Sequence, residues 1–122
     1  MDEMNRPLPY SSSFKPRRFY ADEVYGRIEK HIGDVIRNSR EDEDIVVSVP
    51  LPDGSRLQVR EFGFHNPNFI IVYGIDLETR DSTTTALISH TNIQVLINTI
   101  KKQKEQPRRE IGFLGNVDPQ DA

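Results

Sequence analysis

The side chains most able to do chemistry lie where a predicted strand, residues 83–89, meets a predicted helix, residues 92–104. His90 lies at this junction, and an imidazole can act as an acid, a base or a partner for an anion. The first backbone N–H groups of a helix, here those near Thr91 and Asn92, also favour negative charge. The alternative is a hydrogen-bonded histidine at a strand–helix corner, with Thr91 simply capping the helix.

Two further pairs of residues could complete a site around His90. Tyr73 and Asp76 lie on the strand predicted to be adjacent, and an enzyme of this sequence would have to use one of them with His90 in proton transfer. Arg108 and Arg109 point in different directions on an extended chain, so one could pair with an acid while the other meets a phosphate or carboxylate. These residues define a candidate site for a small anion or nucleotide. The alternative is that they are solvated or structural residues that bind no ligand.

Metal and cofactor chemistry have little support in the sequence. The chain has no cysteine, and His31, His65 and His90 are scattered without a metal-ligand spacing. It also lacks a phosphate-binding glycine loop, a nucleophile elbow and a dinucleotide fingerprint. We therefore expect no catalytic residue, no metal and no cofactor.

The segment before the first predicted helix interleaves basic and aromatic residues, namely Phe14, Arg17, Arg18, Phe19 and Tyr20. Such a pattern can bind single-stranded nucleic acid by stacking and phosphate contacts, and it can equally dock as an arm on an acidic protein. The chain carries 16 Lys and Arg against 19 Asp and Glu, a net charge of −3. That balance disfavours general nucleic-acid binding and favours a protein partner for this arm.

The composition bounds the class of protein. A length of 122 residues fits one domain. No apolar run approaches the roughly 18 residues of a membrane-spanning helix, and the first residues lack the apolar centre of a secretory signal. The absence of cysteine is typical of a cytoplasmic protein. The sequence predicts an irregular arm over residues 1–19, a single domain over 20–115 and a loose tail over 116–122.

The hydrophobic pattern predicts an α+β fold: an N-terminal helix, a four-stranded antiparallel meander, a C-terminal helix and a short final edge strand. Thr91 and Gln94 form a capping box at the start of the second helix. The third strand is apolar on both sides, so we expect it to be covered on both faces. The predicted ranges are 22–38 and 92–104 for the helices, and 44–49, 56–64, 69–75, 83–89 and 111–114 for the strands.

Three segments resemble a family of small bacterial proteins of unknown function. They are the run Asn66-Pro67-Asn68-Phe69-Ile70-Ile71-Val72-Tyr73-Gly74-Ile75-Asp76, the step Leu87-Ile88-Ser89-His90, and the closing segment Pro107-Arg108-Arg109-Glu110-Ile111-Gly112-Phe113. Members of that family carry similar N-P-[DN]…Y-G-x-D, L-I-x-H and P-x-R-I-G-F segments. The resemblance implies a bacterial or phage origin and no particular reaction.

The favoured functional interpretation is a non-enzymatic protein-interaction module, that is, an adaptor, a chaperone-like protein or a regulatory binding protein. Two helices cover one face of a four-stranded sheet, so the other face would need the arm or a second subunit, and we expect self-association. The alternative is a regulatory protein that binds a small anion or nucleotide. Nucleic-acid binding and membrane insertion are not expected.

Overall fold

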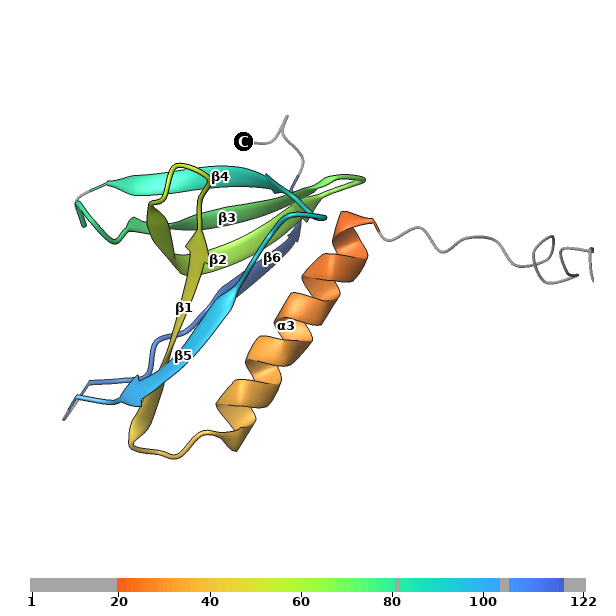
Figure 1. The fold of residues 1–122 in the computed structure, drawn as a ribbon. Coiled ribbons are helices and arrows are strands. Elements are labelled where there is room, and N and C mark those ends of the chain that lie inside the picture. Colours follow the sequence, from red (N-terminus) through yellow and green to blue (C-terminus); the bar gives the residue numbers. More distant parts are fainter. Residues whose placement is uncertain (1–19, 81, 104–105, 118–122) are drawn as a thin grey trace, which may run out of the picture.

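The computed structural model describes residues 20–80, 82–103 and 106–117, and these form one helix and a single six-stranded sheet (Figure 1). The elements are α3 (Ala21–Asn38), β1 (Glu43–Pro50), β2 (Arg56–His65), β3 (Phe69–Asp76), β4 (Thr83–Ser89), β5 (Leu96–Lys101) and β6 (Gly112–Asn116). The predicted fold, with a helix pair and a four-stranded meander, is therefore wrong. The predicted arm and most of the predicted tail lie outside the described residues.

The segment predicted as a second helix instead forms a turn, a short loop and β5. β5 pairs antiparallel with β1, from Glu43 opposite Lys101 to Ser48 opposite Leu96. β2 pairs with β1 only at Ser48–Pro50, so β5 supplies ladder hydrogen bonds for the rest of β1. The capping box does not form, because the Thr91 hydroxyl is 2.8 Å from the Ser89 hydroxyl instead.

β2 exchanges one neighbouring strand for another along its length. Its first residues pair with β1, and from Glu61 onward it pairs with β6 in parallel, with Glu61 opposite Gly112 and Phe62 opposite Phe113. Its register with β3 shifts between Val59 and Glu61, which marks an irregularity of the β-bulge kind. β1 and β6 therefore lie beside different halves of the same strand.

The strand order β4-β3-β2-β1-β5 places β4 and β5 at opposite ends of the sheet, yet residues 90–95 alone connect them. The sheet must therefore curl. α3 contacts β2, β3 and β6 (Figure 1). The helix begins against the β2–β3 turn, where the Ala21 N–H donates to the Pro67 carbonyl and the Asp22 N–H donates to the Asn66 side chain.

The core lies between α3 and the inner face of the sheet. Phe62 is fully buried, and its ring stacks on Phe113 with centroids 5.9 Å apart and an interplanar angle of 13°. Burying a large apolar side chain contributes about 1.5–3 kcal/mol, so this cluster holds the two layers together. The other buried apolar members include Ala21, Tyr25, Ile32, Ile45, Val47, Val49, Leu57, Val59, Ile70 and Val72.

β3 is buried on both faces at its centre. Ile70 and Val72 point into the core, so Ile71 points to the outer face, where it is 5% exposed. Ile71 lies opposite Gly63 of β2, and the Val117 side chain occupies the space that a Cβ on Gly63 would need. A residue of the same chain therefore covers the outer side of β2 next to Ile71.

Candidate functional site

The structure places the sequence-predicted site residues at separate locations. The Asn68 carbonyl accepts a hydrogen bond from the His90 N–H, so His90 lies beside the start of β3, whereas Asp76 is the last residue of that strand. At about 3.3 Å per residue the two are roughly 25 Å apart along the strand. Tyr73 is half-buried opposite Thr85, and it does not share a cavity with His90. These three residues do not form one proton-transfer site.

His90 has a defined hydrogen-bonding geometry. Its Nδ1 atom lies 3.0 Å from the Asn68 carbonyl oxygen. A carbonyl oxygen can only accept, so Nδ1 carries the hydrogen and donates it. In the neutral ring, Nε2 is then the nitrogen that can accept. Asp76 has a local function instead, because its Oδ1 accepts the N–H groups of Glu78 and Thr79 in the β3–β4 turn.

Arg108 and Arg109 both contact the protein itself. The Arg108 guanidinium donates to the Arg40 carbonyl. The Arg109 guanidinium lies 3.4 Å from Asp44, and the Arg109 N–H donates to the same carboxylate at 3.0 Å. These contacts attach the segment before β6 to β1 and to the residues just before it.

The predicted residues for anion binding are distributed over different cavities. Among the cavities of the described residues, His90 lines one beside α3, Asn92 lines one beside β4, and Arg109 lines one beside the irregularity in β2. Thr91 is exposed in the turn after β4. The predicted anion or nucleotide site is therefore not assembled from these groups.

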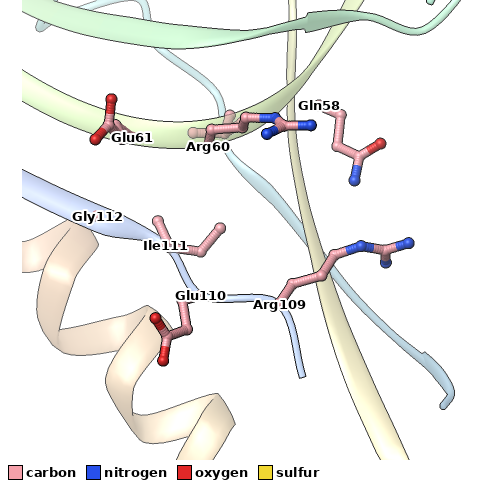
Figure 2. A pocket seen from close by; sticks show the side chains of 8 residues that line it. Gln58, Arg60, Glu61, Arg109, Glu110, Ile111 and Gly112 are labelled. Carbon is pink, nitrogen blue, oxygen red and sulfur yellow. The ribbon is translucent and has the colours of Figure 1, made fainter. Parts of the chain in front are cut away.

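The cavity beside the irregularity in β2 has a volume of about 630 Å³ and opens where β2 exchanges β1 for β6. Figure 2 shows Gln58, Arg60 and Arg109 extending toward one side, while the Glu61 and Glu110 carboxylates lie on the other. The lining thus mixes two cations with two anions. Because Arg109 is already paired with Asp44, the remaining charged lining is Arg60 against Glu61 and Glu110, and this excess of negative charge disfavours the predicted anion.

A second cavity, which we call the helix groove, separates α3 from the β4–β5 connection and has a volume of about 380 Å³. Three basic residues line it: Arg27 and His31 on the helix, and His90 on the facing turn. The remaining lining residues are aliphatic, namely Val24, Ile28, Ile32, Val35, Ile93, Val95 and Ile97.

An apolar row crosses the outer face of four strands, and we call it the outer row. Leu87 lies opposite Ile71, and Ile71 lies opposite Gly63. Leu114 of β6 completes the row, since its Cβ lies 3.8 Å from where a Cβ on Gly63 would be. Leu87 and Leu114 at the two ends are 60% and 47% exposed.

β4 is an edge strand, and its register shows which backbone groups face outward. The Asn68–His90 pair is hydrogen-bonded, and such pairs alternate along an antiparallel ladder. The backbone groups of Thr83, Thr85, Leu87 and Ser89 therefore point away from β3. Apart from the Ser89 carbonyl, which accepts from the next turn, these outward groups have no hydrogen bond from the described residues.

Part of this edge faces a third cavity. A groove of about 490 Å³ runs between Ala86–Ser89 and the β1–β2 turn at Leu51, Pro52 and Asp53. The side chain and N–H of Ser55 both bond to the Asp53 carboxylate, and these bonds hold the pKa of that group below its usual range. The turn is therefore a fixed wall of this groove.

The predicted interaction arm lies almost wholly outside the described residues. Phe14, Arg17, Arg18 and Phe19 belong to the part of the chain that is not described, and Tyr20 is the exposed residue that precedes α3. Within the described residues, no group of three or more His, Cys, Asp or Glu side chains is placed to hold a metal ion. The described part of the chain also has no helix with the length and hydrophobicity needed to cross a bilayer.

Comparison with known proteins found no matching family model, no matching curated protein and no matching solved structure. The predicted site did not include the helix groove. The sequence contains one signal for it: Arg27 and His31 stand four residues apart beside the apolar stripe of the helix.

Proposed function

We propose that this protein is a non-enzymatic protein-interaction module that self-associates through the edge of β4. The observation that supports it is the outward backbone of Thr83, Thr85 and Leu87, which has no hydrogen-bond partner in the described residues. An unpaired edge is a template for a further strand, and proteins usually protect such edges with charge, proline or a bulge. The β4 sequence, Thr-Thr-Thr-Ala-Leu-Ile-Ser, contains neither charge nor proline, and its register with β3 is regular.

The occupant we propose is β4 of a second copy, running antiparallel about a two-fold axis at Ala86. In this register Thr85 of one copy lies opposite Leu87 of the other, and both positions present outward backbone groups. Pairing therefore satisfies N–H and C=O groups on both strands without breaking the β3–β4 ladder. An isologous contact of this kind closes on itself and gives a dimer.

The apolar surface around β4 supports the same register. Leu87 carries the exposed end of the outer row, and pairing would bring the two rows together on one face of a continuous sheet. Burying apolar area contributes roughly 25 cal/mol per Å², which adds to the hydrogen bonds of the pairing. The groove beside Leu51 and Pro52 would receive the first residues of the second copy's strand. A cytoplasmic adaptor, chaperone-like or regulatory role fits such a module.

The test is the solution mass of the full chain and of two variants at one position. The Thr85 N–H points outward, so Thr85→Pro removes a donor needed by a second copy while leaving the β3 ladder intact. Thr85→Val is the matched control, because it keeps the N–H and the β-branched shape. We expect twice the 14.1 kDa chain mass for the wild type and for Thr85→Val, and the chain mass for Thr85→Pro.

A third variant keeps the test decisive if the proline disturbs folding. Leu87→Lys places a charge on an exposed position of the edge and should also give a monomer. A wild type that stays at the chain mass at every accessible concentration would refute self-association. A Leu87→Lys protein that remains dimeric would refute pairing through β4.

A further inference from the structure

We propose that residues 10–14 of the same chain add to the free edge of β5 as a further antiparallel strand and thereby fill the helix groove. This inference goes beyond the proposed self-association and does not rest on it, because β4 and β5 lie at opposite ends of the strand order. Residues 10–14 lie outside the described residues, whereas the edge that would receive them is described in full.

β5 presents an unpaired backbone edge. The Lys102 N–H donates to the Asp42 carbonyl, which fixes the phase of the β1–β5 ladder. Because hydrogen-bonded pairs alternate along an antiparallel ladder, the backbone groups of Ile97, Thr99 and Lys101 point away from β1. These outward groups have no hydrogen bond from the described residues. Such an edge is a template for another strand, and only the last residue of β5 carries a charge that would protect it.

The open edge of β5 faces α3, and the helix groove lies between them. In Figure 1, β5 lies between β1 and α3. Ile97 lines the groove together with Val24, Ile28 and Val35 of the helix, and all four are half-buried. α3 packs mainly on β2, β3 and β6, so the helix leaves the edge of β5 open. A strand placed here would gain backbone hydrogen bonds from one wall and apolar contacts from the other, as in peptide recognition by strand addition.

Residues 10–14, Tyr-Ser-Ser-Ser-Phe, have the pattern of a short strand with one apolar face. Side chains alternate along a strand, so Tyr10 and Phe14 share a face with Ser12. Pro9 and Pro16 flank the segment, and their missing N–H groups limit a strand to the residues between them. Before α3, the sequence has no other run of this length without proline or charge, and this is why we assign the edge to this segment.

The position of α3 sets the direction of the added strand. α3 begins against the β2–β3 turn, and His90, which precedes β5, is hydrogen-bonded to Asn68 of that turn. The starts of α3 and β5 therefore lie at the same end of the groove. At the other end, Lys101 of β5 lies opposite Glu43, shortly after α3 in the chain. A segment that leads into Ala21 and lies along β5 must therefore run antiparallel to β5.

The chain is long enough to make this connection. Val24, one helical turn after Ala21, lines the same cavity as Ile97. Residues 15–20 connect Phe14 to the helix, and six extended residues span about 20 Å. A connection of that length can cross a groove of about 380 Å³ from the helix to β5.

The register follows from the alternation of both strands. The outward groups of β5 lie at every second residue, so they meet every second residue of the added strand. Placing Phe14 beside Ile97 brings the larger apolar residue to the aliphatic end of the groove, where Val24 and Ile28 lie. The opposed pairs are then Phe14–Ile97, Ser12–Thr99 and Tyr10–Lys101. Residues opposed in this way share a face of the sheet, so the side chain of Phe14 would point toward the helix.

Hydrogen exchange of single amides in the full chain tests this pairing. We expect the N–H groups of Ile97 and Thr99 to exchange at least about tenfold more slowly in the wild type than in Ser12→Pro, which lacks the N–H that would face Thr99. Ser13→Pro is the matched control, because the Ser13 N–H would point away from β5, and its exchange rates should stay within about threefold of the wild type. Equal exchange in the wild type and Ser12→Pro, or equal effects of the two prolines, would overturn the proposal.

A pair of introduced cysteines tests the register and shows which copy supplies the strand. The chain has no cysteine, and Ser13 would lie opposite Asn98 at a non-hydrogen-bonded position, where Cα atoms are about 4.5 Å apart and a disulfide can form. With oxidised glutathione, Ser13→Cys/Asn98→Cys should form a disulfide within one chain at least about tenfold faster than Ser13→Cys/Thr83→Cys, whose second cysteine lies on the β4 edge. Non-reducing electrophoresis should show this product at the chain mass of 14.1 kDa.

The outcomes of the cysteine test separate this proposal from self-association. Equal rates in the two double variants would overturn the added strand. A product of Ser13→Cys/Asn98→Cys at twice the chain mass would assign the strand to a second copy and would also overturn the proposal. A monomeric wild type with a disulfide within one chain would refute self-association and support the added strand, because no residue of β4 takes part in it.

Discussion

At the scale of single residues, Tyr25 shows how a polar group is accommodated in this core. Its ring lies 4.9 Å from Phe64 and 5.9 Å from Phe113, measured between centroids, and the residue is 8% exposed. Its hydroxyl oxygen accepts the Gly115 N–H at 2.9 Å. One hydroxyl thus connects the first turns of α3 to the end of β6, far away in the sequence.

Removing that hydroxyl should destabilise the protein at neutral pH. Tyr25→Phe keeps the ring but leaves the Gly115 N–H without its acceptor, at an expected cost of about 1–3 kcal/mol. Urea unfolding followed by circular dichroism would measure the difference. A variant as stable as the wild type would show that water replaces the hydroxyl at no cost.

The Tyr25 phenol also gives the wild type a pH dependence with a defined sign, which Tyr25→Phe lacks. Burial, opposed by the Gly115 hydrogen bond and aided by Glu29, raises the pKa of Tyr25 above its ordinary value of 10.0. The folded state therefore holds this proton more tightly than the unfolded state. The resulting stability is complete below about pH 10 and is lost as pH rises through the folded-state pKa. The wild type should lose more stability than Tyr25→Phe in that alkaline range, and parallel curves would contradict the assignment.

At the scale of elements, Asp44 attaches the segment before β6 to β1. Its Oδ1 accepts the N–H groups of both Ile45 and Arg109, at 2.9 and 3.0 Å. Its Oδ2 faces the Arg109 guanidinium at 3.4 Å. Asp44 is 7% exposed, so these contacts satisfy a carboxylate that has lost most of its water.

Two substitutions at Asp44 separate the hydrogen bonds from the ion pair. Asp44→Asn keeps one carbonyl oxygen for both N–H groups and loses only the charge, so it should cost about 1 kcal/mol or less, because Arg109 is partly exposed. Asp44→Ala removes the acceptor of both N–H groups and should cost about 2–4 kcal/mol. Chemical denaturation of the two variants measures both values. Equal losses would mean that the ion pair, not the hydrogen bonds, anchors the segment.

The sequence predicts an element correctly where the residues that determine it are close together in the chain, and wrongly where they are far apart. The amphipathic stripe on α3 and the turn residues between the first four strands act within a few positions, and the structure has a helix and strands at those places. In residues 92–104, Ile93, Leu96, Ile97 and Ile100 fit a helical stripe. The alternation of Ile93, Val95 and Ile97 fits a strand equally well. The strand forms because the edge of β1 that β2 leaves unpaired needs hydrogen-bond partners. No pattern within residues 92–104 shows that need.

The predicted site failed for the same reason. Arg108 and Arg109 were chosen because their types suit ligand contacts, but each contacts a group that the tertiary fold brings to it. Asp76 instead accepts N–H groups of its own turn, two and three residues further along the chain. Two residues of the predicted set line cavities with other basic residues: His90 lies with Arg27 and His31, and Arg109 lies with Arg60. In both cases the neighbours come from segments that the fold, not the local sequence, brings together.

At the scale of the molecule, distant segments close on one core. Phe113 of β6 stacks on Phe62 of β2 and meets Tyr25 of α3 edge to face, with an interplanar angle of 80°. β1 lies between β2 and β5, and β6 lies beside the half of β2 that β1 leaves. The last strand thus contacts the helix, so we expect disruption of either element to lower the stability of the whole sheet.

This arrangement predicts a single cooperative unfolding transition that depends on β6. Phe113→Ala should destabilise the protein by about 2–4 kcal/mol, because it removes a ring from the shared core. Phe113→Leu, which keeps most of the apolar volume, should cost less. In each protein, the midpoint from far-ultraviolet circular dichroism should coincide with that from the near-ultraviolet signal of the tyrosines, as two-state behaviour requires. A helix signal that persists after the tyrosine signal is lost in Phe113→Ala would show that α3 and β6 belong to separate folding units.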